Sequence, residues 1–364
     1  MDTAPRPVLP FLLVFRSSPP VVSVVLPVRN AVTTIARAIG SVRAQTQADW
    51  ELVVVDDGSS DGTRKIVREL ARTEARMRLI EQATAGVAAA ANAGAAEARG
   101  EFIARMDADD VSHPERLAAQ VAFLTARENR DIGVVGSLVE FGGDRAVSAG
   151  YALHVDWTNL LVTPAAIALN RFVEAPLVNP SVMFRRELVA RHGGYRDGDF
   201  PEDYELWLRW LDAGVRMAKV PRVLLTWHDA PTRLTRTDAR YGPEKFFRLK
   251  AEWIVRELAR SAGGRPVYVW GAGRHTRKRV AHLAAHGVAI AGYIDVDAKK
   301  TGRGLGGTGV PVIGVEALPA PGQSAGGGQV FVLSYVTTRG AREYNRARLL
   351  GSGYVEGRDF LMCA

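Results

Sequence analysis

The stretch Glu51–Thr63, ELVVVDDGSSDGT, joins a run of apolar and β-branched residues directly to a segment of aspartate, glycine and serine. The first six residues have the length and composition of a strand, and the rest predict a tight turn leading into a helix. Val21–Pro27, VVSVVLP, begins the same order of strand, turn and helical pattern. Both strands are almost continuously apolar, which is typical of a parallel sheet covered by helices on both faces. We therefore predict an α/β fold with a mostly parallel sheet.

Further segments extend this pattern along the chain. We expect a helix at residues 86–98, strands at 101–106 and 132–141, and an amphipathic helix at 202–213. After Arg222 the chain is basic and reads as turn-rich, and a helix over 243–259 then links to a second unit. That unit starts near Arg265, with a strand at 266–270, a helix at 277–286, a strand at 289–294, and glycine-rich loops at 302–309 and 326–328.

Composition describes an ordinary globular protein with an uneven charge. The 364 residues are enough for two domains, and 47% hydrophobic with 24% charged residues excludes a disordered or membrane-embedded chain. Residues 261–364 carry 13 basic and 6 acidic side chains, and this accounts for +7 of the net charge of +8. The arginines are scattered, so nucleic acid is not expected as a partner. The single cysteine, Cys363, predicts a reducing, cytoplasmic location, and the apolar run 8–15 is too short to span a bilayer.

The carboxylates with the clearest chemical meaning follow the predicted strand at 101–106. Asp107 and Asp109 lie at i and i+2, so in an extended segment they share one face. Oxygen ligands at the carboxyl end of a parallel strand suit Mg²⁺ or Mn²⁺ with a phosphate-bearing ligand. The alternative is a pair of solvated loop acids. Asp57 also ends a strand and would face the same ligand, whereas the turn itself is explained by capping from Ser60 or Asp61.

Four segments together resemble the family 2 glycosyltransferases of the GT-A fold, in order and spacing over about residues 21–235. They are VSVVLPVRNA, ELVVVDDGSSDGT, GVAAAANAGAAEARGEFIARMDADD and FPEDYELWLRW. The resemblance implies a nucleotide-diphospho-sugar transferase fold. It also implies an inverting transfer of a sugar from a UDP- or dTDP-sugar to an acceptor hydroxyl, assisted by a divalent cation, in the synthesis of a polysaccharide, glycolipid or cell-surface glycan.

The resemblance also assigns roles to individual residues. Pro27 and Asn30 would border the base pocket, Asp57 would hydrogen-bond the base, and Asp107 would lie near the ribose. Asp109 would bind the metal and the diphosphate. Arg29 stands where many relatives carry an aromatic residue, and its guanidinium could still stack on the base.

The resemblance places the general base at the start of the predicted helix at 202–213. It implies Asp203 as the base, with Glu202 as its rival. We expect the N-terminal helix dipole to hold the Asp203 carboxylate ionised, which lowers its basicity.

Three weaker assignments concern the edges of this site. Asn92 is placed near the donor. The stretch from Thr226 to Arg240 would form a flexible lid whose arginines, Arg233 and Arg236 among them, meet the diphosphate, or else a solvated basic loop. His228 would be a third metal ligand, or a packed histidine without that role.

The second unit begins with Gly271-Ala272-Gly273, which holds two of the three glycines of a dinucleotide-binding turn, and Asp295 ends the next strand. This arrangement resembles small Rossmann-type domains, and we expect the fold without a bound cofactor. The rival function is a non-catalytic sensor or scaffold that binds nucleotides or NAD(P).

The predicted division of the chain is a disordered leader at 1–20, a GT-A domain at 21–235, a helical linker at 236–264 and a Rossmann-like domain at 265–364. The expected partners are a nucleotide-sugar donor and a glycan or lipid-linked acceptor. The basic second unit suggests a peripheral contact with the phosphates of the inner membrane face.

Overall fold

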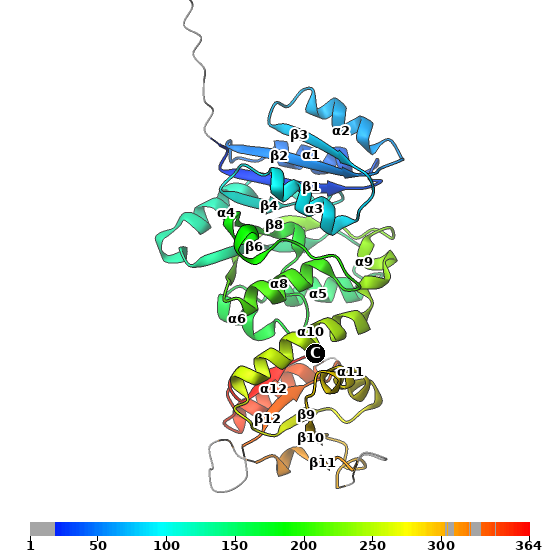
Figure 1. Ribbon diagram of the computed structural model, residues 1–364, viewed down its shortest axis with the longest axis vertical. Helices are drawn as coiled ribbons and strands as arrows, with labels where there is room; N and C mark the ends of the chain where they lie inside the picture. Colours follow the sequence, from blue (N-terminus) through cyan, green and yellow to red (C-terminus); the bar gives the residue numbers. More distant parts are fainter. Residues whose placement is uncertain (1–18, 303, 305–308, 320, 322–328, 339) are drawn as a thin grey trace, which may run out of the picture.

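The computed structural model describes residues 19–302, 304, 309–319, 321, 329–338 and 340–364. Nearly all of the predicted leader, much of the glycine-rich loop at 302–309 and all of the one at 326–328 lie outside these residues. The described chain forms two α/β units stacked along the long axis of the molecule, each around its own sheet (Figure 1). Within the described residues, no helix combines the length and the apolar character that a bilayer crossing requires.

The first unit is built on an eight-stranded sheet in the order β3-β2-β1-β4-β7-β6-β8-β5. The β1–β2, β2–β3, β1–β4 and β6–β8 pairs are parallel, and the pairs made by β7 and β5 are antiparallel. The strands are β1 (Val22–Val28), β2 (Trp50–Asp57), β3 (Met77–Gln82), β4 (Phe102–Arg105), β5 (Val111–Ser112), β6 (Ile132–Phe141), β7 (Met183–Arg185) and β8 (Arg216–Trp227).

Helices cover this sheet, as the apolar strands require. Every residue of β1 and β2 is buried, which confirms that both faces of these strands are packed. The helices are α1 (Ile35–Arg43), α2 (Thr63–Ala71), α3 (Val87–Glu97), α4 (Arg116–Thr125), α5 (Ala149–Asn159), α6 (Pro164–Asn170), α7 (Glu187–His192), α8 (Glu202–Asp212) and α9 (Leu234–Thr237).

The alanine-rich helix α3 lies unusually close to the sheet because its side chains are small. A Cβ atom added at Gly94 would lie 2.5 Å from Val25 and 3.2 Å from Val55. These two valines belong to β1 and β2, so the helix backbone reaches both strands. The close approach holds the start of α3 beside the carboxyl ends of these strands.

A buried carboxylate ties β2 to its neighbours at the opposite end of the sheet. Glu51 is 2% exposed and accepts hydrogen bonds from the Ser23 hydroxyl at 2.6 Å and the Arg99 backbone N–H at 2.8 Å. The guanidinium groups of Arg99 and Arg78 reach the same carboxylate at 2.6 and 3.1 Å. A buried charge with this many partners is fully compensated.

The second unit is a five-stranded parallel sheet in the order β11-β10-β9-β12-β13. Its strands are β9 (Val267–Trp270), β10 (Ile290–Ile294), β11 (Val312–Ile313), β12 (Phe331–Ser334) and β13 (Phe360–Met362). Its helices are α11 (Arg274–Ala285) and α12 (Ala341–Gly351), and α10 (Pro243–Ser261) precedes them. A second parallel sheet agrees with the Rossmann-like prediction, while the domain boundaries themselves stay a prediction.

Helix α10 joins the two units through a common core. One apolar cluster contains Tyr204 and Leu208 of α8, Phe247 and Ile254 of α10, and residues of the second sheet such as Leu333. Lys250 of α10 also reaches both units, because its buried ammonium donates to the carbonyls of Phe172 at 2.8 Å and Cys363 at 2.7 Å. The predicted linker helix is thus a packed element.

The prediction of a turn-rich segment directly after Arg222 is wrong. Strand β8 continues to Trp227 and pairs with β6, so Thr226 and Trp227 belong to the sheet and not to a lid. The Thr226 hydroxyl also lies 2.9 Å from a ring nitrogen of His113, across the neighbouring strand β5. The irregular segment therefore begins at His228, where β8 delivers the chain to the carboxyl end of the sheet.

Candidate functional site

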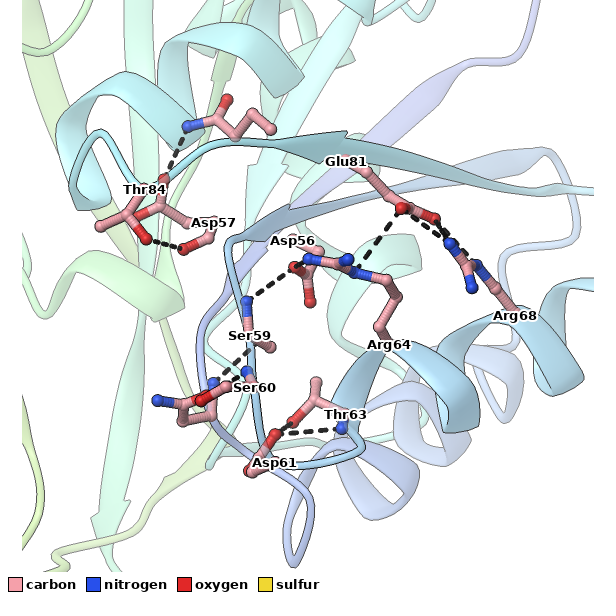
Figure 2. Close-up of polar contacts among 12 residues, drawn as sticks. Asp56, Asp57, Ser59, Ser60, Asp61, Thr63, Arg64, Arg68, Glu81 and Thr84 are labelled. Carbon is pink, nitrogen blue, oxygen red and sulfur yellow. Dashed lines mark hydrogen bonds and ion pairs between the residues drawn. The ribbon is translucent and has the colours of Figure 1, made fainter.

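The turn after β2 and the loop after β1 are locked together by side-chain hydrogen bonds. Asn30 adopts a φ of 51°, and its side-chain carbonyl oxygen accepts from the Ser60 backbone N–H at 2.9 Å. In return, the Asn30 backbone N–H donates to the Ser59 hydroxyl at 2.9 Å. The buried Asp56 carboxylate accepts from the Ser59 N–H and from Arg64, both at 2.9 Å (Figure 2). These bonds fix a rigid rim at the carboxyl end of the sheet.

Asp61 orders the turn before α2, but the predicted capping by Ser60 or Asp61 is not found, because the cap residue is Gly62 and no described side chain makes a cap hydrogen bond. The Asp61 carboxylate accepts from the Thr63 N–H at 3.0 Å and from the Thr63 hydroxyl at 2.6 Å (Figure 2). The second oxygen of this carboxylate accepts from the Val32 N–H at 3.0 Å. The Ser60 side chain makes no cap hydrogen bond to α2, and its backbone N–H donates to Asn30. Asp61 thus serves the turn, and the neighbouring Asp57 remains the candidate for ligand binding.

Asp57 lies at the end of β2 and is 4% exposed. Its carboxylate accepts from the Gln82 side-chain amide at 2.7 Å and from the backbone N–H groups of Ala85 at 2.8 Å and Gly86 at 3.0 Å. The Thr84 hydroxyl donates to the Asp57 carbonyl (Figure 2). Asp57 therefore orders the loop before α3, and its contact with a base stays a prediction.

The remaining residues assigned to the donor differ in their surroundings. Pro27 is buried within β1, while Arg29 is exposed in the following loop. Asn92 of α3 uses its whole amide on the backbone of Tyr195, donating to the carbonyl at 2.8 Å and accepting from the N–H at 2.9 Å. This pairing gives Asn92 a structural role, and its contact with a donor stays a prediction.

Three carboxylates gather after β4. One oxygen each of Asp107, Asp109 and Asp110 lies within 4.8 Å of the others. Asp110 is fully buried, with one oxygen accepting from the His228 N–H at 2.8 Å and the other without a hydrogen-bond partner. Burial, with Asp109 and Asp107 close by, raises the pKa of Asp110 well above its ordinary value. An unpartnered buried oxygen within an all-oxygen cluster fits a divalent cation such as Mg²⁺ or Mn²⁺.

Two arginine side chains compensate this cluster. The Arg233 side chain is 8% exposed, and its guanidinium lies 3.7, 3.4 and 3.2 Å from oxygens of Asp107, Asp109 and Asp110, respectively. Arg105, at the end of β4, reaches Asp107 at 2.9 Å. The alternative of a solvated basic loop is therefore wrong for Arg233. Because burial of a charge depends on tertiary packing, the residue types alone did not indicate Arg105 or Asp110, although both flank the predicted aspartates.

The segment after β8 carries the other predicted cations. The His228 ring nitrogen Nδ1 is buried without a partner, but His228 does not belong to the group formed by the three carboxylates, and its role as a metal ligand stays a prediction. The Arg236 guanidinium pairs with Asp229 and donates to the Ser148 hydroxyl at 2.8 Å. Arg236 therefore braces this segment against the start of α5. Its contact with a diphosphate stays a prediction.

The two candidates for the general base, Glu202 and Asp203, lie at the start of α8. Glu202 is 4% exposed and accepts from the Tyr241 hydroxyl at 2.6 Å. Asp203 accepts from the Tyr204 N–H at 2.7 Å. Burial and the adjacent Glu202 carboxylate raise the pKa of Asp203 to about 7. The expected lowering of its basicity by the helix dipole is wrong, because desolvation and like-charge repulsion are larger here.

Tyr241 is a contact that the sequence did not indicate. It is 39 residues from its partner Glu202 and lies in the short helical turn Ala239–Tyr241 that precedes α10. Lys245 and Arg248 of α10 also pair with Asp199, just before α8. Side chains from the segment that links the two units therefore hold Glu202 and the residues just before α8.

The turn that opens the second unit is stabilised by contacts with residues of the same unit. Gly271 adopts a φ of 113°, a value that favours glycine. The Asp295 carboxylate accepts from the backbone N–H groups of Ala272 and Asp297, both at 3.0 Å, and from Lys300 at 3.1 Å. These contacts stabilise the turn, and nucleotide or NAD(P) binding here stays a prediction.

Comparison with known proteins gives the family. The sequence profile described as Glycosyl transferase family 2 matches residues 23–193. WfgD of Escherichia coli, a UDP-Glc:alpha-D-GlcNAc-diphosphoundecaprenol beta-1,3-glucosyltransferase, is 41% identical over 236 residues, which cover 64% of this chain and 84% of WfgD. The chain belongs to glycosyl transferase family 2. EpsE of Bacillus subtilis is 34% identical to this family 2 chain over 209 residues, covering 55% of the chain and 70% of EpsE.

A solved structure supports the fold of this family 2 glycosyltransferase. Residues 1–349 of S. aureus TarS, in complex with UDP-GlcNAc, superpose with a TM-score of 0.51 and 20% sequence identity, covering 72% of this chain and 70% of TarS 1–349. Similarity at this level concerns the fold alone. The predicted GT-A fold is confirmed.

Proposed function

We propose that this family 2 glycosyltransferase is a metal-dependent, inverting enzyme. It would move a sugar from a nucleoside diphosphate donor to a hydroxyl of a lipid-linked or polysaccharide acceptor. The observation that carries the proposal is the cluster of Asp107, Asp109 and Asp110 at the carboxyl end of β4, with an unpartnered buried oxygen on Asp110. The similarity to WfgD, whose name gives a UDP-sugar donor and a diphosphoundecaprenol-linked acceptor, supports the same substrate classes.

The donor would lie along the rim made by the loops after β1, β2 and β4. Pro27, Arg29, Asn30 and Asp57 are proposed for the nucleoside, whose base would be of the uracil or thymine type. The fixed turn around Asn30 supports this placement because it presents a rigid surface next to Asp57. We keep Asn92 as a secondary donor contact, to be tested after these residues.

The diphosphate would lie at the acidic cluster. Asp109, with Asp107, Asp110 and His228, is proposed to hold Mg²⁺ or Mn²⁺, which supplies Lewis-acid neutralisation of the departing nucleoside diphosphate when bound. Arg233 and Arg236 would add positive charge on the same side. A guanidinium binds phosphate oxygens through two parallel N–H groups, so these arginines also orient the leaving group.

The acceptor hydroxyl would lose its proton to Asp203. A carboxylate with a pKa near 7 is ionised in about half of the molecules at neutral pH and is a stronger base than an ordinary aspartate. Glu202 is not the base in this scheme; its carboxylate accepts from the Tyr241 hydroxyl and, through its charge, helps to raise the pKa of Asp203. Attack by the hydroxyl from the face opposite the leaving group inverts the anomeric centre in one displacement.

We also propose the predicted division of the chain. It has a transferase unit over residues 21–235, a linking helix within 236–264 and a Rossmann-like unit over 265–364. The second unit carries most of the net positive charge. We infer a peripheral contact with anionic lipid at the inner membrane face, where a lipid-linked acceptor would be met.

A donor screen tests the proposal. The purified chain would be incubated with a set of UDP- and dTDP-sugars, Mn²⁺ or Mg²⁺, and undecaprenyl- or short-chain-lipid diphosphosugars, with mass spectrometry of the products. We expect a single hexose or N-acetylhexosamine to be added, in the metal-containing samples only. Metal-independent turnover, or stabilisation by NAD(P) without any sugar-nucleotide binding, would contradict the proposal and favour the sensor or scaffold function.

A further inference from the structure

The most unusual contact of the acidic cluster is the one with Arg233. Its guanidinium lies 3.2 Å from Asp110, 3.4 Å from Asp109 and 3.7 Å from Asp107. A single cation at this distance from three carboxylates stands where a divalent ion would neutralise the same three groups. Arg233 is thus a protein-supplied counter-charge for the site.

Other contacts build this position of Arg233. The guanidinium lies 4.4 Å from the centre of the Trp227 ring, in a cation–π contact, and also donates to the His228 carbonyl. Trp227 is the last residue of β8, so the sheet itself supports the arginine. With only 8% of the side chain exposed, the guanidinium is held against the acids.

Two cations cannot share these three carboxylates without repulsion, even though the unpartnered oxygen of Asp110, Oδ2, is not the one that Arg233 contacts. Arg233 uses Oδ1 of Asp110 and Oδ2 of Asp109, while a divalent cation binds carboxylate oxygens at about 2.0–2.6 Å. An ion among these oxygens would lie within a few ångströms of the guanidinium, where like charges repel strongly in a desolvated site. Guanidinium groups also match phosphate geometry through paired N–H donors.

We propose that Arg233 is a resident counter-cation of the three-aspartate site, which a divalent cation displaces and which then pairs with the diphosphate of the donor. This inference rests on the proposed function, because it assigns metal and diphosphate to the cluster. It adds that a divalent cation enters the site by displacing the Arg233 guanidinium from the three aspartates. Arg233 then lowers the affinity for the free ion and raises the affinity for the ion together with the nucleotide.

The test measures metal binding by the full chain without turnover. Free Mn²⁺ would be followed by electron paramagnetic resonance during titration of the wild type, of Arg233→Gln, and of the matched control Arg222→Gln, whose guanidinium pairs with Glu115. We expect Arg233→Gln to bind Mn²⁺ alone about ten-fold more tightly, because the competing charge is gone. The control should bind as the wild type does.

A second titration includes UDP. In the wild type, saturating UDP should tighten Mn²⁺ binding, and this enhancement should shrink several-fold in Arg233→Gln. Equal or weaker Mn²⁺ binding by Arg233→Gln, or an unchanged effect of UDP, would overturn the exchange. Turnover of the wild type in the donor screen tests the proposed function separately, so either idea can fail without the other.

A third variant covers the case in which Arg233→Gln does not fold. Arg233→Lys keeps the charge, but a compact ammonium lacks the planar fork that reaches several carboxylates at once. We expect this variant to bind Mn²⁺ alone a few-fold more tightly than the wild type and to lose part of the UDP effect. Mn²⁺ binding by Arg233→Lys that equals the wild type in both titrations would also contradict the proposal.

Discussion

Replacing Asp203 by asparagine tests the chemistry of the acceptor side most directly. With a pKa of about 7, the Asp203 carboxylate is ionised in about 9% of molecules at pH 6 and about 91% at pH 8. If the ionised form is the base, kcat of the wild type rises about ten-fold over this range. The side-chain amide of asparagine cannot accept the proton, and loss of a general base slows turnover by about 10²–10⁴-fold. We therefore expect Asp203→Asn to be slow and to lack the acidic limb of the profile.

The assay measures initial release of the nucleoside diphosphate, with saturating donor, metal and acceptor, from pH 5.5 to 9. Donor binding, followed by calorimetry in the same buffers, should change less than two-fold, because Asp203 makes its only described hydrogen bond with the backbone of Tyr204. The reasoning is refuted if Asp203→Asn keeps more than a tenth of the wild-type rate, or if it keeps an acidic limb near pH 7.

Glu202→Gln is the matched control because it separates the two carboxylates. Removing the Glu202 charge removes one of the causes that raise the pKa of Asp203, so the acidic limb should move to lower pH while turnover continues. Glutamine still offers an oxygen to the Tyr241 hydroxyl, which limits structural damage. Complete loss of turnover in Glu202→Gln, together with activity in Asp203→Asn, would assign the base to Glu202.

Three further predictions concern the metal and the sheet. Chelation should abolish transfer and added Mn²⁺ or Mg²⁺ should restore it, while Asp110→Asn should weaken Mn²⁺ binding by about ten-fold or more in a direct titration. Glu51→Gln should lower the free energy of unfolding in urea by about 2–4 kcal/mol at pH 7. Burial tends to raise the pKa of Glu51, but its hydrogen bonds outweigh burial and lower the pKa. The difference in stability between the wild type and Glu51→Gln should therefore be fully present above the ordinary pKa of 4.5. It should fade as the pH falls through the lowered pKa of the folded protein. Gly100→Ala should cost about 1–3 kcal/mol because its Cβ would lie 2.7 Å from the Ser23 backbone nitrogen, whereas Gly40→Ala, with open space around it, should stabilise α1 by about 0.5–1 kcal/mol.

The strands that the sequence predicted are those with local apolar signals. Residues 132–141 form β6 with the predicted bounds, and β1, β2 and β4 differ from their predictions by one residue at each end. Strand β8 was not predicted, and its last residues, among them Thr226 and Trp227, were assigned to a turn-rich segment because they follow a proline and an arginine. Their strand conformation comes from pairing with β6, about 85 residues earlier in the chain, and such long-range pairing leaves no local pattern.

In the candidate site, the spacing of Asp107 and Asp109 indicated a cation, but it did not indicate which neighbours are buried. Asp110 and Arg105 adjoin these residues in sequence, and only packing makes one a buried acid with one unpartnered oxygen and the other a buried counter-charge. Burial also reversed the expected effect on Asp203, since the helix dipole is a local property and desolvation is not.

The segment from His228 to Tyr241 gives physical content to the predicted lid. Arg233 in this segment contacts the acidic cluster, and Tyr241, eight residues later, holds Glu202 beside the candidate base. One short stretch of chain therefore touches both the diphosphate side and the acceptor side of the proposed reaction. It continues directly into α10, which packs against α8 of the first unit and against the second sheet. The displacement of Arg233 proposed above would therefore take place in the same stretch of chain that holds Glu202 through Tyr241.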